Sequence, residues 1–287
     1  KGSFEGIGAE IGIRKEVLTI ISPLKDSPAE KAGLKGGDKI LKIDDKPTND
    51  LALDEAVRLI RGPKGSSVTL TVFRDSFDKV KEFKITRDTI RITILTTEKK
   101  GEGIFVIKLN HFTQNAAWEF RRAVQEFYQS GSQKLILDMR NNPGGFLNVA
   151  VDIASWFLPA GEVVTKERVA EGERDIYRSA GYKLLEKVPT VVLINEGSAS
   201  ASEIVAGALR DVRGIKLVGT KTFGKGSVQD VRTLPDGSGL KITISQWLTP
   251  LGRVINREGI APDFEVQMTA DDYKNDRDPQ FEKAKEI

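Results

Sequence analysis

A serine nucleophile paired with a lysine or histidine base can carry out catalysis without a cofactor, and this sequence contains all three residue types. Ser200 stands in a run of small residues, Gly197-Ser-Ala-Ser-Ala-Ser-Glu203, between an apolar strand and an expected helix. Small residues let a substrate backbone approach, and a helix N-terminus stabilises a developing oxyanion. A nucleophilic serine also needs a base, and the chain offers Lys225 between two glycines and His111, its only imidazole. The chain therefore offers a candidate nucleophile in a suitable setting and two candidates for its base.

Ser200 also fits a purely structural role. The segment Ser200-Ala-Ser-Glu203 matches the S-x-x-E capping box, in which a serine satisfies free N–H groups at a helix start. Ser198 and Ser202 are further serines in the same run, and no G-x-S-x-G elbow singles out one of them. The local pattern therefore leaves open which serine, if any, is a nucleophile.

The segment around Lys225 has two interpretations. A lysine acts as a base only when burial lowers the pKa of its ammonium group from about 10.4 towards about 7, and Phe223 favours an apolar setting here. Residues 219–225 also match the G-x-x-x-x-G-K pattern of a phosphate loop. Gly226 replaces the Ser or Thr of that loop, and a strand rather than a helix follows, so nucleotide binding is not expected.

The composition excludes several kinds of catalytic and binding site. The 287 residues include 44 basic and 41 acidic side chains, without the clustered basic excess of a nucleic-acid binder. Cysteine is absent, which rules out disulfides, thiolate nucleophiles and Cys-based metal sites, and one histidine cannot build a multi-histidine metal centre. No apolar run reaches the ~20 residues of a membrane span. We therefore expect no metal, cofactor, nucleotide or nucleic-acid partner.

Residues 1–88 predict a small, mostly β domain. A short helix is expected over 28–33, with Ser27 as its cap, and a second helix ends at Gly62-Pro63. Runs of β-branched or alternating residues predict strands at 17–21, 39–43, 68–72 and 82–85.

Residues 89–287 predict an α/β core. Apolar strands, glycine-rich loops and helices follow one another, which is typical of a sheet with buried strands. Loops at strand ends carry the chemistry of such cores, and here they are 141–145 and 195–200. A hairpin is expected around 235–239 and a charged, peripheral segment from Ala270. Strands are expected at 104–109, 134–138, 190–194 and 215–218. Helices are expected over 113–128, after the loop 141–145 as far as about residue 157, and after the loop 195–200 as far as about residue 209.

The ordered motifs of this chain resemble those of the C-terminal processing peptidases, the tail-specific serine proteases. The resemblance covers nearly the whole sequence. It implies a protease core of crotonase-like and Clp-like ββα units over 89–287, preceded by a mostly β PDZ domain over 1–88. The motifs are Phe4-Glu-Gly-Ile-Gly8, Ser27-Pro-Ala-Glu-Lys-Ala-Gly-Leu34 with Gly37-Asp-Lys-Ile-Leu41, Leu137-Asp-Met-Arg-Asn-Asn-Pro-Gly-Gly145, Gly197-Ser-Ala-Ser-Ala-Ser-Glu203 and Phe223-Gly-Lys-Gly-Ser-Val-Gln229.

The resemblance implies a serine endopeptidase with a Ser-Lys dyad and no cofactor. It makes Ser200 the nucleophile, Lys225, 25 residues later, the general base, and Gln229 the residue that orients the lysine. It places the oxyanion hole at the N–H of Ala201 and one from the Gly144-Gly145 turn. Lys225 and Gln229 are four residues apart, which on a strand would put both on one face.

The implied PDZ domain would recognise substrate C-termini. Such domains add a peptide as a strand beside a helix, while loop amides hold its carboxylate. Gly6-Ile7-Gly8 would be that loop, and a helix with Leu53, Val57 and Ile60 at i, i+4 and i+7 would form the groove wall. Those three residues fit the domain's own core equally well. Expected partners are proteins or peptides with apolar C-termini.

Two other functions fit part of the pattern. A PDZ scaffold with a non-catalytic protease-like core would bind C-termini without cutting them, and a crotonase-like acyl-CoA enzyme would use a similar core. The intact Ser200, Lys225 and Gln229 favour the peptidase. Members of the family act outside the cytoplasm, so the resemblance implies an extracytoplasmic location, in the bacterial periplasm, at the cell surface or in the thylakoid lumen. The helical segment that often carries the family's dimer contacts is not seen before Phe4, so a homo-oligomer is left open.

Overall fold

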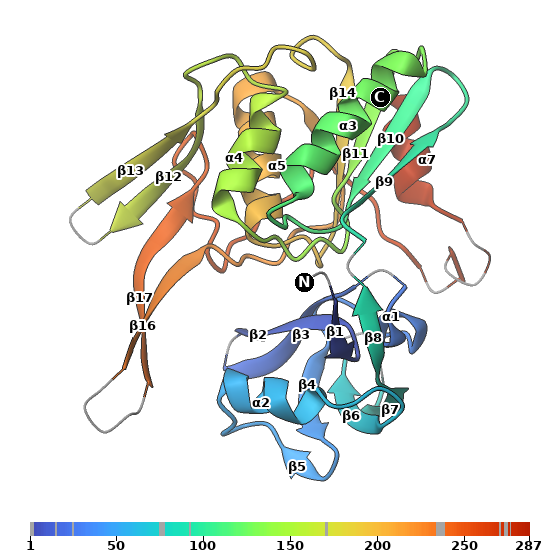
Figure 1. Cartoon of the computed structure of the whole chain (residues 1–287), viewed down its shortest axis with the longest axis vertical. Coiled ribbons are helices and arrows are strands. Elements are labelled where there is room, and N and C mark those ends of the chain that lie inside the picture. The colour runs from blue at the N-terminus through green and yellow to red at the C-terminus, as the bar shows by residue number, and fades with distance from the viewer. Residues whose placement is uncertain are drawn as a thin grey trace.

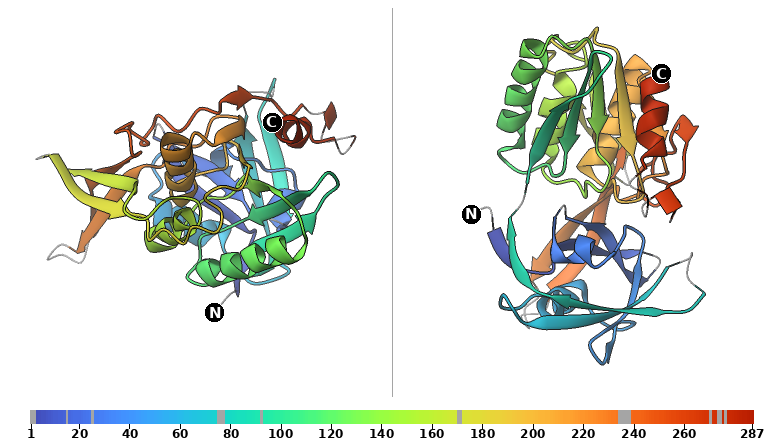
Figure 2. Two further views of the ribbon diagram at one scale, coloured as in Figure 1. Left: turned by 90° about the horizontal axis from the view of Figure 1, so that it is seen from above. Right: turned by 90° about the vertical axis from the view of Figure 1, so that its right-hand side faces the viewer.

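The chain folds into an N-terminal, mostly β domain and a larger α/β core (Figure 1). Figure 2 shows the same two domains from above and from the side. The computed structural model describes residues 3–14, 16–24, 26–74, 78–91, 93–169, 172–233, 239–269, 271–272, 275 and 277–287. At residues 3, 91, 173–174, 229–233 and 241 it describes the backbone and not the side chain.

An antiparallel sheet in the order β2-β3-β4-β6-β7, with β5 beside β4, forms the N-terminal domain. Ile20, Ile40 and Leu70 lie in its apolar core. β2 is an edge strand, and no strand of the described chain pairs with its outer side. The elements are β1 (Ser3–Gly6), β2 (Ala9–Arg14), β3 (Val17–Pro23), α1 (Pro28–Lys31), β4 (Lys39–Ile43), β5 (Lys46–Pro47), α2 (Leu53–Ile60), β6 (Ser67–Phe73), β7 (Lys81–Thr86) and β8 (Asp88–Arg91), with β8 paired to β1.

The core is built on a sheet in the order β18-β15-β14-β11-β10-β9, parallel except for the edge strand β9. Phe105 and Ile107 face the cluster that includes α3, α4 and α5, while Ile104 and Val106 face the cluster that includes α7. Helices therefore cover both faces of the sheet. The elements are β9 (Leu95–Lys99), β10 (Ile104–Leu109), α3 (Ala116–Gln129), β11 (Lys134–Asp138), α4 (Leu147–Ser155), β14 (Thr190–Ile194), α5 (Ala201–Arg213), β15 (Lys216–Gly219), β18 (Phe264–Glu265) and α7 (Pro279–Glu286).

A second antiparallel sheet, β13-β12-β17-β16, projects from the core. Its β16–β17 hairpin extends alongside the N-terminal domain (Figure 1). The strands are β12 (Val163–Val169), β13 (Gly172–Arg178), β16 (Ser227–Thr233) and β17 (Gly239–Leu248). The predicted hairpin is confirmed, although most of its expected turn lies outside the described residues.

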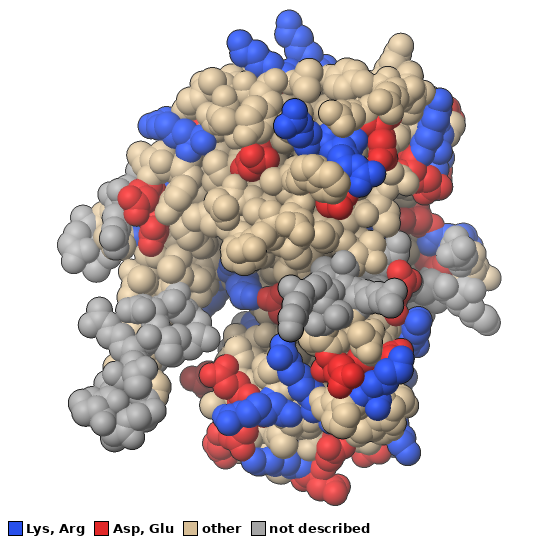
Figure 3. Space-filling model, viewed as in Figure 1, with Lys and Arg blue, Asp and Glu red and all other residues tan. Residues whose placement is uncertain are grey.

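On the face drawn in Figure 3, acidic and basic side chains are interspersed, and neither sign gathers into a single large patch. In the described part of the chain, no helix combines the length and the apolar composition needed to cross a membrane.

Candidate active site

Ser200 occupies the sharp turn between β14 and α5. It immediately precedes α5, and its backbone has φ 56° and ψ −115°. Residues other than glycine rarely adopt a positive φ, and such strain concentrates at functional sites. Ser200 is half-buried, whereas Ala199 and Ala201 on either side are fully buried. The turn therefore leaves part of Ser200 accessible to solvent, whereas the residues on either side of it are buried.

Ser198 and Ser202 have structural roles instead. Both are fully buried. The Ser198 hydroxyl donates to the carbonyl oxygen of Met139 (2.7 Å), and the Ser202 hydroxyl donates to that of Asn142 (2.8 Å). Because both hydroxyls are buried and bonded to the neighbouring loop, neither serine is available to a substrate. Ser200 is therefore the one candidate nucleophile left of the three serines.

The glycine loop after β11 passes directly beside Ser200. Gly144 and Gly145 have φ values of +98° and +145°. A Cβ atom on Gly144 would lie 2.8 Å from the Cβ of Ser200 and 2.9 Å from the nitrogen of Ala201. One on Gly145 would lie 2.2 Å from the carbonyl oxygen of Phe112. Glycine at 144 therefore permits the close approach to the serine turn, and glycine at 145 permits the close approach to Phe112.

The predicted oxyanion-hole residues lie together at this contact. The N–H of Gly144 donates to the side-chain carbonyl of Asn142 (3.0 Å). Among the described residues, the N–H groups of Ala201 and Gly145 make no hydrogen bond. Gly145 rather than Gly144 thus has the unoccupied donor, next to that of Ala201.

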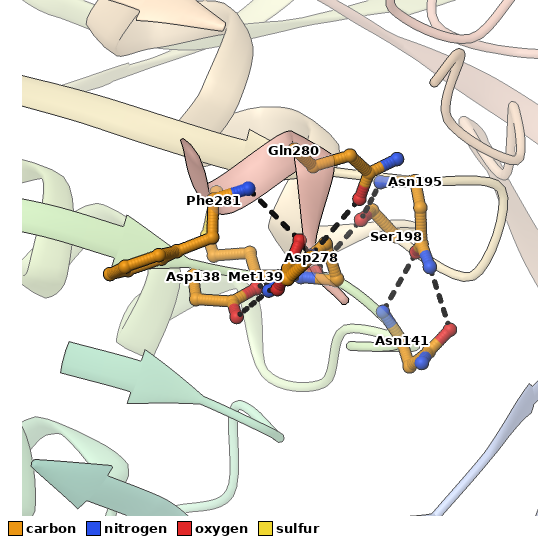
Figure 4. Close-up of polar contacts among 9 residues, drawn as sticks. Asp138, Met139, Asn141, Asn195, Ser198, Asp278, Gln280 and Phe281 are labelled. Atoms are coloured by element: carbon orange, nitrogen blue, oxygen red, sulfur yellow. Dashed lines mark hydrogen bonds and ion pairs between the residues drawn. The ribbon is translucent and has the colours of Figure 1, made fainter. Parts of the chain in front are cut away.

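Paired asparagines fasten the glycine loop to the serine turn (Figure 4). The backbone N–H of Asn141 donates to Oδ1 of Asn195, and Nδ2 of Asn195 donates back to Oδ1 of Asn141, both at 2.8 Å. Asn141 has φ 55°, a conformation that asparagine tolerates better than most residues. Sequence reasoning did not assign these two residues, although Asn141 lies inside one of the motifs.

Glu203 joins the serine turn to the segment that carries Lys225. Its buried carboxylate accepts hydrogen bonds from the Thr222 hydroxyl (2.6 Å) and the N–H groups of Gly224 (2.7 Å), Ser200 (2.8 Å) and Lys225 (2.9 Å). Burial raises the pKa of Glu203, and these four donors oppose that rise. The sequence marked Glu203 only as the last position of a capping box. Its bonds to the segment around Lys225 were not foreseen.

The ammonium group of Lys225 is bonded to the N-terminal domain. Its Nζ lies 2.5 Å from Oε1 of Glu10 on β2, and the two side chains are 41% and 27% exposed. No hydrogen bond joins Lys225 to Ser200 in the part of the chain that the structure describes. Glu203 thus joins the two backbones, whereas the side chain of Lys225 is directed to Glu10.

Gln229 lies on β16 opposite Thr243, and its side chain is outside the described residues. The expected shared face with Lys225 is not supported by the backbone. Lys225 precedes the first residue of β16, and the ladder shifts register between Val228 and Gln229. A β-bulge interrupts the alternation on which that expectation depended.

His111 lies near the same ion pair. Burial lowers the pKa of His111, the charge of Glu10 raises it, and that of Lys225 lowers it. Its Nδ1 is buried and has no hydrogen-bond partner among the described residues. A catalytic histidine is normally oriented by a third group, and no described residue bonds Nδ1 of His111. The described residues also contain no group of three or more acidic or histidine side chains arranged for a metal ion.

The residues predicted for peptide binding surround one cavity in the N-terminal domain. The cavity measures about 190 Å³ and lies between β2 and α2. Leu53, by contrast, packs against the domain core, and Ile60 belongs to that core while also lining the cavity. The lining residues are Phe4, Gly6, Ile7, Gly8, Ala9, Glu10, Ile11, Val57, Ile60 and Arg61.

The N-terminal domain rests on the loops of the candidate site. The Ser22 hydroxyl donates to the carbonyl oxygen of Asn141 (2.6 Å). Ile21 forms a buried cluster with Ala199 and Phe223. Both loops beside Ser200 therefore contact a domain that also carries the peptide cavity.

Two family models match the chain in separate ranges. The model described as peptidase family S41 matches residues 103–266, and the model described as a PDZ domain matches residues 19–74. The first range lies in the core and the second in the N-terminal domain.

Curated relatives are similar to nearly all of this chain. A protein of Staphylococcus epidermidis named "Probable CtpA-like serine protease" is 41% identical over 266 residues, which are 92% of this chain and 54% of the relative. The carboxyl-terminal-processing protease of a Picosynechococcus species is 42% identical over 268 residues, 91% of this chain and 64% of the relative. The chain thus spans between half and two thirds of their length. Among solved structures, the photosystem II D1 C-terminal processing protease matches with a TM-score of 0.85 and 30% identity, over 93% of this chain and 73% of that one.

Proposed function

Because the chain belongs to peptidase family S41, we propose that it is a serine endopeptidase that recognises the C-termini of its substrates and cleaves them with Ser200 and Lys225. The observation that carries this proposal is the backbone of Ser200. A half-buried serine is held at φ 56° before a buried helix, and the N–H groups of Ala201 and Gly145 beside it have no hydrogen-bond partner among the described residues. A capping role alone does not require that strained conformation.

The proposed reaction is acyl transfer through a serine ester. Lys225, as a neutral amine, takes the proton of the Ser200 hydroxyl while the serine oxygen attacks the peptide carbonyl carbon. The oxyanion accepts hydrogen bonds from Ala201 and Gly145. Lys225 then gives its proton to the departing amine as the C–N bond breaks. Lys225 next takes a proton from water as the water oxygen attacks the ester carbonyl carbon. It returns that proton to the Ser200 oxygen as the ester C–O bond breaks, which releases the new C-terminus and restores the neutral amine. Gln229 is proposed to orient Lys225.

The N-terminal domain is proposed to select the substrate. A peptide strand can pair with the open edge of β2, where Gly6, Ile7 and Gly8 supply loop amides and Val57 lines an apolar wall. This geometry favours proteins or peptides with apolar C-termini. An extracytoplasmic location is part of the same proposal, and a homo-oligomer stays a prediction.

The pairing of Lys225 with Glu10 supports a resting form of the enzyme. While its Nζ donates to Glu10, Lys225 is not placed to take the proton of Ser200. Glu10 also lines the peptide cavity. A peptide that pairs with β2 would therefore lie beside Glu10 and displace Lys225 from its carboxylate. Lys225 would then be free to approach Ser200.

The test is cleavage of a loosely folded substrate with an apolar C-terminus, with fragments identified by mass spectrometry. We expect Ser200→Ala and Lys225→Ala to abolish cleavage. Lys221→Ala, an exposed lysine in the same loop, should leave it intact. Two aspartates added to the substrate's C-terminus should slow cleavage by the wild type.

Full activity in either dyad variant would overturn the proposal. The pairing of Lys225 with Glu10 is also what a non-catalytic PDZ scaffold would show. That alternative gains support if the wild type binds the apolar C-terminus but neither cuts the substrate nor reacts with a fluorophosphonate probe.

A further inference from the structure

The C-terminal helix α7 is connected to the glycine loop of the site through one buried arginine, Arg140. Arg140 lies between the end of β11 and Asn141, where the loop begins. Its guanidinium donates to Oδ1 and Oδ2 of Asp138 (3.0 and 2.8 Å) and also to Oδ1 of Asp278 (2.8 Å), just before α7. A second contact joins Nη2 to Oδ2 of Asp278 (2.8 Å). One guanidinium is thus shared between two carboxylates.

We propose that Arg140, Asp138 and Asp278 form a clamp through which α7 positions the glycine loop 141–145 for catalysis. None of the three touches Ser200, so they are positioning residues rather than catalytic ones. Arg140 and Asp138 are largely buried, with side chains 14% and 5% exposed. A rigid arginine fork fixes direction as well as distance.

The clamp also orients the backbone that leads into the loop. The N–H of Arg140 itself donates to Oδ1 of Asp138 (3.0 Å). The next residue, Asn141, bonds Asn195, and the carbonyl oxygen of Asn142 accepts from the N–H of Ala199 (3.0 Å). A displacement at Arg140 is therefore passed on to the turn that holds Ser200.

Helix α7 is anchored firmly enough to act as the fixed end of the clamp. The Asp278 carboxylate also caps α7 by accepting from the N–H of Phe281 (2.9 Å), as Figure 4 shows. Gln280 is 2% exposed; its Nε2 donates to the carbonyl oxygen of Val266 (2.8 Å) and its Oε1 accepts from Arg140 (3.1 Å). Ala284 is buried against the sheet.

Asp138 keeps its charge at neutral pH. Burial alone would raise the pKa of Asp138, but the adjacent Arg140 lowers it below its usual range. The helix lies beyond residue 266, where the match to the peptidase model ends. The clamp therefore ties a segment outside that match to the centre of the proposed site.

Asp278→Asn tests the clamp, because asparagine keeps the capping ability of aspartate and removes its charge. Misplacement of catalytic groups by about 1 Å can cost about 100-fold in rate, so a partial loosening predicts a kcat about 10-fold lower. KM should change little, since the peptide cavity lies in the other domain. Asp271→Asn, the same change at an exposed aspartate of this segment, is the control. Asp278→Glu, which keeps the carboxylate, should recover most of the rate.

Amide hydrogen exchange of peptides covering 139–146 provides the second measurement. It should be faster in Asp278→Asn than in the control, at similar thermal midpoints. An unchanged kcat with unchanged exchange, or a rise in KM alone, would overturn the clamp. The kcat measurement rests on the proposed function, since it requires peptidase activity. If the wild type cleaves nothing, the hydrogen-exchange comparison alone tests the clamp. The proposed function is tested separately, by comparing the wild type with Ser200→Ala.

Discussion

At the scale of single residues, the Glu203 carboxylate is the shared anchor of the two proposed catalytic residues. One oxygen accepts from Thr222 and Gly224, and the other accepts from the backbone N–H groups of Ser200 and Lys225. Four donors aimed at one buried group are the surroundings that an ionised carboxylate requires. Glu203 thus sets the distance between two backbones that are distant in sequence.

Glu203→Gln should damage both stability and catalysis. An amide has one acceptor oxygen, so its NH₂ group would face two backbone N–H donors. Each buried donor left unsatisfied costs about 1–3 kcal/mol, and we expect the free energy of unfolding to fall by about 2–6 kcal/mol. Denaturant unfolding measures this loss, and kcat should fall more than about tenfold, since the alignment of Ser200 and Lys225 depends on the same bonds.

Glu258→Gln, an exposed glutamate, is the matched control and should be neutral. A Glu203→Gln protein as stable and as active as the control would contradict the anchoring role.

At the scale of elements, the site forms because β11 and β14 are adjacent and parallel. Asp138 pairs with Leu193 near the carboxyl ends of the two strands. The loops that follow them, the glycine loop and the serine turn, must therefore emerge at the same edge of the sheet. Glycine at 144 then permits van der Waals contact between the two loops.

Gly144→Ala should separate these loops. The new methyl group would lie 2.6 Å from the carbonyl oxygen of Ala199 and 2.8 Å from the Cβ of Ser200. We expect kcat to fall by about 100-fold as the oxyanion donors move. Gly131→Ala is the control, because Gly131 also has a positive φ but has no atom near its added Cβ.

Comparison of the two variants separates steric displacement from backbone strain, which both share. Equal losses of activity in both would mean that contact between the loops does not matter.

At the scale of the whole molecule, the N-terminal domain is in direct contact with Lys225, the proposed base. It contacts the glycine loop through Ser22 and Lys225 through Glu10. The ion pair is partly exposed, and such pairs are worth about 0.2–1 kcal/mol. A bound peptide can break a contact of this strength. The Glu10–Lys225 pair is therefore weak enough for reversible control of Lys225.

Glu10→Gln should raise basal activity. Removing about 1 kcal/mol of stabilisation from the resting form predicts up to about fivefold faster cleavage of a short reporter peptide with an amidated C-terminus. Stimulation of the wild type by an added peptide with an apolar C-terminus should be weaker in this variant. Glu16→Gln, on an exposed turn of the same domain, should behave like the wild type. Lower basal activity in Glu10→Gln would argue against a resting pair.

Local patterns predicted the central elements well. The strands predicted at 104–109, 134–138 and 190–194 are confirmed. They could be predicted because buried parallel strands have continuous apolar sequences. The fold class, a peptidase core with a PDZ domain, is confirmed by the family matches and the superposed structure. Strands β12 and β13 were missed, since their charged residues hide the alternation, and α7 was missed within a charged segment.

The sequence by itself determined the family motifs, the central apolar strands and the turn that carries Ser200, because each depends on residues close together in the chain. Only the tertiary structure decided that Ser198 and Ser202 are structural, that Gly145 has the free donor, and that Lys225 pairs with Glu10. Glu10 and Lys225 are 215 residues apart. Their contact arises from the docking of two domains, and no local pattern records how two folded surfaces meet.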